Sequence, residues 1–262
     1  MQENLTLFPD ERIDKVNENI TIIQKKDGLT FGTDAYMLAA FMKEQKKARA
    51  VELGAGTGII SLLVASRERF SHVCAVEIQE EFASLASRNV ELNGLGERID
   101  VIHSDVRDLT HAHVGGEVDV VFSNPPYMKR DSGKRNEADM KYIARHEVCG
   151  SVSDFCAAAK KLLKHGGRFY AVWRPDRLSE LLTAMSLNSL EPKELTLIAA
   201  DPLTPPSIAL VRAHKGGAAG MNVTRSLFIY SSADDRSAPA RKMSADAERI
   251  YDTMSFEDFL SR

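Results

Sequence analysis

This chain of 262 residues has few cysteines, no long apolar run and little excess of one charge. Each of these features argues against a class of protein. The three cysteines, Cys74, Cys149 and Cys156, are odd in number and lack C-x-x-C spacing, which argues against a disulfide framework or a zinc site. No apolar run approaches the roughly 18 residues that span a membrane, and the start lacks a basic region followed by an apolar stretch. We therefore expect a cytoplasmic protein with reduced, structural cysteines and no bound metal.

The formal net charge is only -3, which argues against a general basic coat for nucleic acid but allows local patches. The composition, 44% hydrophobic and 27% charged, is ordinary for a globular protein. The length allows one large α/β domain with additions or two small domains. No internal repeat or coiled-coil heptad is evident.

The most informative stretch is Asn124-Pro125-Pro126-Tyr127, which follows an apolar run at 118–123 that is typical of a buried parallel strand. This order places the motif at the carboxyl end of a strand, where open α/β sheets bind their ligands. The prolines fix φ and remove two N–H donors, so the Asn124 amide and nearby carbonyls can accept hydrogen bonds from a planar NH2 group. Tyr127 can stack on the flat system that carries the amine. The alternative is a Pro-rich turn without a ligand.

The sequence of residues 51–65 predicts a strand, a glycine-rich turn and a helix. Gly54, Gly56 and Gly58 allow a sharp turn and a close approach to a ligand. The spacing differs from the G-x-G-x-x-G of dinucleotide-binding proteins, and the turn lacks the Lys-Ser/Thr of a P-loop. Glu52, just before the turn, suits a cationic amino-acid ligand better than a pyrophosphate. A purely structural turn is the alternative.

Two further strands end in acids. The strand at 72–77 ends in Glu77, followed by Ile78, about 20 residues after the glycine turn, where a ribose hydroxyl pair would be bound. The strand at 98–103 is followed by Asp105 and Val106, and Asp105 is placed to accept a hydrogen bond from an adenine amine. Both acids could instead be solvated strand ends.

The region before the glycine turn predicts a small β element and then a helix. Short alternating runs at 12–16 and 20–24 precede the turn signal at 27–28. The segment 31–41 predicts a helix with Thr33 or Asp34 in the N-cap position, whose first turn carries free donors and a carboxylate. A capped core helix with no ligand is the alternative.

Residues 128–145 carry six basic against three acidic side chains beside the proposed target pocket, and can bind phosphates. A solvated loop is the alternative.

The second half of the chain predicts further helices and strands. We predict a helix from 151 or 153 to 164, a strand at 168–173 and a helix from 174–178 onward. An antiparallel pair of strands at 195–200 and 208–213, a strand at 226–230 and a short terminal helix anchored by 249–251 and 256–259 follow.

Four motifs follow one another along the chain: Glu52 with the glycine turn, Glu77, Asp105 and the stretch at 124–127. In this order they resemble the motifs of class I S-adenosylmethionine-dependent methyltransferases that act on amino groups. The segments 31–35, 144–147, 166–169 and 174–178 make the chain similar to the tRNA1(Val) (adenine(37)-N6)-methyltransferase family. The resemblance implies an α/β fold with a Rossmann-like, seven-stranded sheet and helices on both faces. We expect an N-terminal β extension at 1–31, a methyltransferase domain at 32–232 and a partly flexible C-terminal tail at 233–262.

The resemblance also implies a reaction: methyl transfer from S-adenosylmethionine to the exocyclic N6 amine of an adenine in tRNA, at position 37 next to the anticodon. The implied catalytic residues are Asn124, Pro125 and Tyr127. The implied cofactor-binding residues are Thr33, Asp34, Glu52, Gly54, Gly56, Gly58, Glu77, Ile78, Asp105, Val106 and Asn124. The residues expected to contact RNA are Lys129, Arg130, Lys134, Arg135, Arg145 and Arg174.

Other functions use the same features. A glutamine side chain also carries a planar NH2 group, and glutamine-N5 methyltransferases acting on release factors share the Asn-Pro-Pro-Tyr motif. The helix predicted at 31–35 and the lack of a separate N-terminal helical domain favour RNA over protein. A DNA adenine substrate is disfavoured because no target-recognition domain is visible. A non-catalytic binding module is disfavoured by the intact motif at 124–127, and a nicotinamide dehydrogenase by the misplaced third glycine.

Overall fold

The computed structural model describes residues 7–26, 32–125, 150–232 and 241–261. Tyr127 and five of the expected RNA contacts lie outside the described residues, namely Lys129, Arg130, Lys134, Arg135 and Arg145. No helix of the described residues combines the length and apolar character that crossing a bilayer requires.

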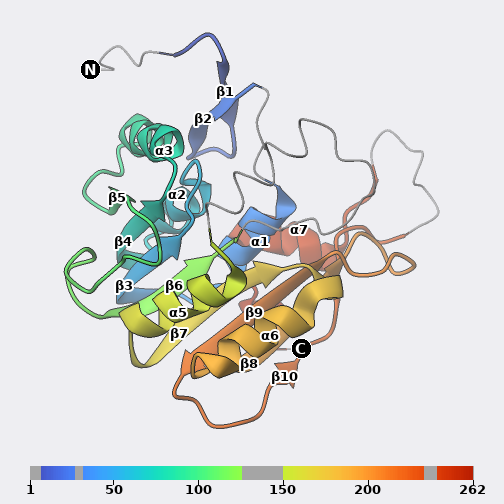
Figure 1. Ribbon diagram of the computed structural model, residues 1–262. Helices are drawn as coiled ribbons and strands as arrows, with labels where there is room; N and C mark the ends of the chain where they lie inside the picture. Colours follow the sequence, from blue (N-terminus) through green and yellow to red (C-terminus); the bar gives the residue numbers. More distant parts are fainter. Residues whose placement is uncertain (1–6, 27–31, 126–149, 233–240, 262) are drawn as a thin grey trace, which may run out of the picture.

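The centre of the molecule is a single twisted sheet (Figure 1). Its seven long strands, in spatial order, are β8 (Leu190–Ala199), β9 (Ile208–Lys215), β7 (Leu163–Trp173), β6 (Val118–Ser123), β3 (Gln45–Leu53), β4 (Phe70–Glu77) and β5 (Ile99–His103). The five strands from β7 to β5 are parallel, and β9 is antiparallel to both of its neighbours. The expected α/β fold with seven strands is therefore confirmed.

The order of the strands reverses between β3 and β6. From β3 the chain runs outward through β4 to β5, and it then returns to β6 on the other side of β3. Such a switch point opens a crevice at the carboxyl ends of the two strands, because their connections leave in opposite directions. The glycine turn follows β3 and Asn124 follows β6, so the two motifs meet at this crevice.

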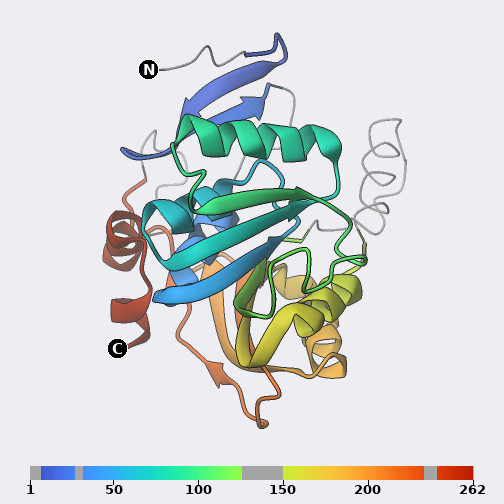
Figure 2. The ribbon, with the colours of Figure 1, turned by 90° about the vertical axis from the view of Figure 1, so that its left-hand side faces the viewer.

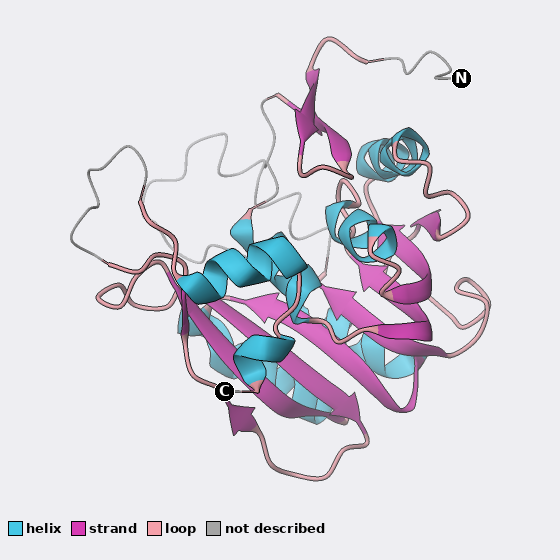
Figure 3. Cartoon of the chain, turned by 180° about the vertical axis from the view of Figure 1, so that it is seen from behind, coloured by secondary structure: helices cyan, strands magenta, loops and turns pink. Residues whose placement is uncertain are grey.

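Helices cover both faces of the sheet, as Figures 2 and 3 show. One face packs on α1 (Thr33–Phe41), α2 (Ile59–Ser66) and α3 (Glu80–Leu92). The other face packs on α5 (Val152–Leu162) and α6 (Leu178–Leu187), which follows a short 3-10 helix, η1 (Pro175–Arg177). The near-continuous apolar strands are buried on both sides, as the pattern at 118–123 predicted.

Two short additions lie at the margins. The N-terminal hairpin of β1 (Glu11–Lys15) and β2 (Thr21–Lys25) packs against α3, where a small β element was predicted. The two-residue strands β10 (Asn222–Val223) and β11 (Leu227–Phe228) extend the sheet beside β8. The strand predicted at 226–230 is therefore shorter than expected, because Tyr230 forms a separate bridge with Met243.

The C-terminal segment packs on α1. Its helices are α7 (Ala245–Thr253) and α8 (Glu257–Leu260), where a short terminal helix was predicted. The Tyr36 and Tyr251 rings stack with their centroids 4.8 Å apart, and the Tyr36 hydroxyl donates to the Tyr251 carbonyl at 2.7 Å. Phe256 is 1% exposed and packs edge-on against Phe41. Residues 241–261 thus contribute directly to the hydrophobic core.

Two predicted helix boundaries are wrong. The N-cap of α1 is Gly32 rather than Thr33 or Asp34, and Thr33 is already the first helical residue. The helix at 152–162 ends at Leu162 instead of Lys164, because β7 starts directly at Leu163. Residues 164–167 form a bulge between the pairs Val118–Leu163 and Val120–Arg168, and Gly166 has the positive φ of +74° that this detour requires.

The two described cysteines are free and buried, in agreement with their expected structural role. Burial raises the pKa of the Cys156 thiol to about 12 and also raises the pKa of Cys74. Cys149 lies outside the described residues.

Cys74 shares one sheet face with His72 and Asp100, and the donor atoms of the three lie within 4.8 Å of one another. The His72 Nε2 atom is 2.9 Å from Asp100 Oδ2, and Cys74 lies opposite Asp100 in the pairing of β4 with β5, so the strand register accounts for their closeness.

Candidate active site

The first component of the site is the end of β6. Ser123, the last residue of the strand, is fully buried, and its Oγ donates to the Leu53 carbonyl at 2.7 Å. This bond ties the end of β6 to the end of β3. Asn124 follows directly, and its Nδ2 donates to Asp34 Oδ2 at 3.0 Å. Pro125 is buried behind it. The bond to Asp34 defines the Oδ1 end of the Asn124 amide as its acceptor end.

The second component is the start of α1, which supplies Asp34. A carboxylate in the first turn of a helix is stabilised by the partial positive charge of the helix N-terminus. Gly32 permits this position, because a Cβ on it would lie 2.7 Å from Asp34 Oδ1. Thr33 is exposed, and Tyr36 of the same helix stacks on Tyr251 and so links the C-terminal helix α7 to α1.

The third component is the glycine turn between β3 and α2. Gly54, Gly56 and Gly58 all have positive φ, at +74°, +55° and +81°. The amides of Gly54 and Ala55 both donate to the Val76 carbonyl on β4 at 2.9 Å. A Cβ on Gly54 would lie 3.2 Å from the Phe155 ring, and one on Gly58 would lie 3.3 Å from Ala86 Cβ. A Cβ on Gly56 would meet nothing within 4 Å, so the open side of the turn is at Gly56.

Glu77 closes the turn from β4. Its side chain is 4% exposed, and Oε2 accepts from the Gly56 amide at 2.8 Å while Oε1 accepts from the Gln79 amide at 2.9 Å. A carboxylate has about four lone-pair positions, so each oxygen can accept a further hydrogen bond. Glu77 can therefore hold the turn and bind a hydroxyl pair at the same time.

The side chain of Glu52, on β3, bonds to α2. It is 1% exposed, and its Oε2 accepts from both the amide and the hydroxyl of Ser61 on α2. Burial raises the pKa of the Glu52 carboxyl to about 8, and the nearby Glu77 charge adds to this rise. The carboxyl is therefore mainly protonated at neutral pH and attracts a cationic ligand only weakly. The expected role of Glu52 in binding the cofactor stays a prediction.

Asp105 lies beyond β5 and is held by Arg107. The Arg107 amide donates to Asp105 Oδ1 at 2.9 Å, and the guanidinium bonds both carboxylate oxygens. This guanidinium lowers the pKa of Asp105, so the acid is ionised at neutral pH and can accept from an amine. Val106 is buried and Ile78 is partly buried.

Arg174 follows β7, beside the end of β6, so it reaches the same edge of the sheet as Asn124. Its guanidinium pairs with Asp176 at 2.9 Å and 2.7 Å. Of the expected RNA contacts, Arg174 alone falls within the described residues.

Three residues that organise the site had no signal in the sequence: Ser61, Arg107 and Ser123. Each acts on a site residue or strand end that is brought close by folding, except Arg107, which lies two residues from Asp105. An Arg two residues after an acid is common on protein surfaces, so that spacing carries little information.

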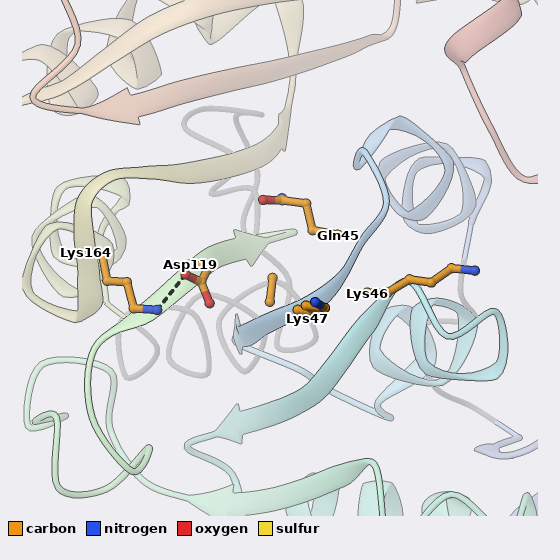
Figure 4. Close-up of a pocket in the computed structure, with 6 residues that line it drawn as sticks. Gln45, Lys46, Lys47, Asp119 and Lys164 are labelled. Atoms are coloured by element: carbon orange, nitrogen blue, oxygen red, sulfur yellow. Dashed lines mark hydrogen bonds and ion pairs between the residues drawn. The ribbon is translucent and has the colours of Figure 1, made fainter.

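A hollow lies at the opposite edge of the sheet (Figure 4). Its volume is about 440 Å³, and it lies at the start of β3, β6 and β7. Its lining residues are Gln45, Lys46, Lys47, Ala48, Asp119 and Lys164. Because Asn124 lies beyond the other end of β6, this hollow is separate from the site described above.

Comparison with known proteins identifies the family of the chain. Residues 25–191 match the model of the methyltransferase small domain family. Over 159 residues the chain is 32% identical to the tRNA1(Val) (adenine(37)-N6)-methyltransferase of Dyadobacter fermentans, covering 61% of this chain and only 64% of that protein. Over 194 residues it is 29% identical to the protein of the same name from Bacteroides fragilis, covering 74% of this chain and 81% of that one.

A solved structure is similar over most of the fold. The crystal structure of a predicted O-methyltransferase from Agrobacterium tumefaciens superposes with a TM-score of 0.67 at 24% identity. The superposition covers 85% of this chain and 97% of that one. At this identity the likeness concerns the fold of the chain.

Proposed function

The chain belongs to the methyltransferase small domain family, and on that premise we propose that it methylates the exocyclic N6 amine of an adenine in tRNA, using S-adenosylmethionine. Position 37, next to the anticodon, is the proposed site. The observation that carries the proposal is the placement of the Asn124 amide at the switch point, oriented by Asp34 and facing the same crevice as the glycine turn. The relatives named for this reaction support the choice of an adenine in tRNA.

The residues of the site fit the proposed cofactor. The open side of the turn at Gly56 leaves room for a ligand to approach the backbone. Glu77 can accept from a ribose hydroxyl pair while it holds the Gly56 amide. Asp105, ionised and fixed by Arg107, can accept from an adenine amine, with Ile78 and Val106 as apolar neighbours. When bound, S-adenosylmethionine supplies an electrophilic methyl group on a sulfonium.

Asn124 and Pro125 are proposed to make the exocyclic amine of the adenine a better nucleophile. The lone pair of an exocyclic amine is delocalised into its ring, so the amine attacks poorly. Hydrogen bonds from the two amine protons to Asn124 Oδ1 and the Pro125 carbonyl would direct that lone pair out of the ring plane. Held in this way, the amine nitrogen would be aligned with the methyl group that S-adenosylmethionine supplies, the thioether would be the leaving group, and one amine proton would pass to solvent. Catalysis is mainly positioning and electrostatics.

The target base has to leave its stack to reach this amide. A tRNA loop offers unpaired bases at low cost, and Tyr127 is proposed to stack on the extruded adenine. Arg174 and the basic residues of 128–145 are proposed to bind the flanking phosphates.

The proposal is tested by incubating the protein with labelled S-adenosylmethionine and, in parallel, total tRNA and protein extract from a strain lacking this gene. We expect N6-methyladenosine in tRNA, identified by nucleoside mass spectrometry. Label in protein alone would replace the proposal with glutamine methylation. Label in neither would leave a small-molecule substrate or a non-catalytic role.

Two variants separate catalysis from cofactor binding. Asn124→Ala should lower the transfer rate at least about 1,000-fold while the dissociation constant for S-adenosylmethionine changes less than about threefold, because the amide acts on the amine. Glu77→Ala should instead weaken the cofactor first, by about 10- to 100-fold, because it removes both an acceptor and a support of the turn. Loss of cofactor binding in Asn124→Ala would contradict the assignment.

A further inference from the structure

Asn89 of α3 is fully buried, although asparagine is mostly an exposed residue. Its amide makes three hydrogen bonds. Oδ1 accepts from the Ile23 amide at 2.7 Å, and Nδ2 donates to the Ile23 carbonyl at 3.1 Å and to the Thr57 carbonyl at 3.0 Å. The side chain therefore joins the N-terminal hairpin to the glycine turn, which lie on either side of α3.

We propose that Asn89 is a positioning residue for the cofactor, which braces the glycine turn against the N-terminal hairpin. The proposal rests on the proposed function, because it takes the glycine turn as the cofactor-binding element. Thr57 lies between Gly56 and Gly58, and the backbone on both sides of it has positive φ. Glu77 holds the Gly56 amide from the β4 side, and Asn89 holds the Thr57 carbonyl from the α3 side.

The brace has a physical use because a glycine-rich turn is costly to order. Glycine loses more conformational freedom on folding than any other residue, and a ligand that orders a loose turn binds more weakly. A turn fixed before the cofactor arrives avoids that loss. Without the Asn89 amide, the buried Ile23 carbonyl and the part-buried Thr57 carbonyl would also lack this donor.

The same helix offers a matched control one turn later. Asn93 binds the hairpin in the same way, with Oδ1 accepting from the Thr21 amide at 3.0 Å and Nδ2 donating to the Thr21 carbonyl at 2.7 Å. Its remaining bond goes to the Asn89 carbonyl within its own helix, at 2.7 Å. Asn93 thus supports the hairpin, and only Asn89 of the pair bonds the glycine turn. Figure 2 shows the hairpin lying along α3.

The experiment compares Asn89→Ala with Asn93→Ala by amide hydrogen exchange of the protein alone and by calorimetric titration with S-adenosylmethionine. Asn89→Ala should speed exchange in both β2 and the segment 54–61, and should raise the cofactor dissociation constant about tenfold. The turnover number at saturating cofactor should stay within about twofold, because the Asn124 amide is untouched. Asn93→Ala should speed exchange in β2 alone and leave the dissociation constant within about twofold.

Equal effects of the two variants on the turn would overturn the proposal, as would unchanged exchange and affinity in Asn89→Ala. If Asn89→Ala does not fold, Asn89→Asp serves instead, because it keeps the size and the Oδ1 acceptor but sets a carboxylate against two carbonyls. It should show the same changes as Asn89→Ala. Hydrogen exchange tests the brace without the cofactor, whereas failure of the unmodified protein to bind S-adenosylmethionine would count against the proposed function.

Discussion

The buried carboxyl of Glu52 shows how one residue can couple the fold to pH. Burial against α2 raises its pKa from the ordinary 4.5 to about 8, despite the two hydrogen bonds from Ser61 that favour the ionised form. The folded protein therefore binds a proton at Glu52 that the unfolded chain releases between these two values. The free energy of unfolding contributed by Glu52 is fully present below pH 4.5 and is lost as pH rises to about 8.

Glu52→Gln should remove this dependence, because the amide cannot ionise. Between pH 5.5 and pH 8.5 the wild type should lose about 3 kcal/mol of unfolding free energy relative to the variant. Urea denaturation at both pH values measures the difference. Parallel pH dependence in the two proteins would mean that Glu52 is already ionised at pH 5.5.

Among the elements, the glycine turn shows that equal backbone strain can have unequal consequences. Gly54 and Gly56 both have positive φ, which costs a side chain about 1–2 kcal/mol. At Gly54 a Cβ would also press on the Phe155 ring of α5, whereas at Gly56 it would enter open space. Gly54 is therefore needed for packing, and Gly56 for access to the turn.

Substituting each glycine with alanine should separate these two effects. Gly54→Ala should lower the free energy of unfolding by about 2–3 kcal/mol, and Gly56→Ala by about 1 kcal/mol. Gly56→Ala should nevertheless weaken S-adenosylmethionine more, because its methyl group occupies the approach to the turn. Denaturation and calorimetric titration measure the two quantities, and the reverse ranking in either would contradict this account.

At the scale of the whole molecule, the C-terminal segment is part of the main core. Phe256 contacts Phe41 of α1 and Phe259 of α8 with ring centroids 5.7 Å and 5.6 Å apart. The buried guanidinium of Arg69 adds hydrogen bonds to the carbonyls of Met42 and Met254. The segment at 241–261 therefore docks on the same helix that carries Asp34 into the site.

Phe256→Ala should lower the free energy of unfolding by about 3–5 kcal/mol in a single cooperative transition. The exposed Leu187, at 78%, gives the control, since Leu187→Ala should change it by less than about 0.5 kcal/mol. Chemical denaturation followed by fluorescence and circular dichroism measures both. A separate early transition in the variant would mean that the segment unfolds independently.

The sequence by itself determined the parts of this protein that depend on neighbouring residues. The buried strand at 118–123 was predicted with its observed bounds, because a short apolar run and the following prolines are local signals. The sharp glycine turn and the order of the four motifs along the chain were equally accessible. These features also carried the resemblance to methyltransferases, since a family is recognised by such local patterns.

Only the tertiary structure decided the partners that complete those motifs. Asn124 meets Asp34 across 90 residues of sequence, Asn89 meets Ile23 across 66, and the buried Glu52 bonds Ser61 on α2. The Tyr36 hydroxyl reaches the Tyr251 carbonyl across 215 residues. The physical reason is that a side chain's hydrogen-bond type is written in the sequence, whereas its partner is set by which buried groups the packed sheet and helices leave within reach.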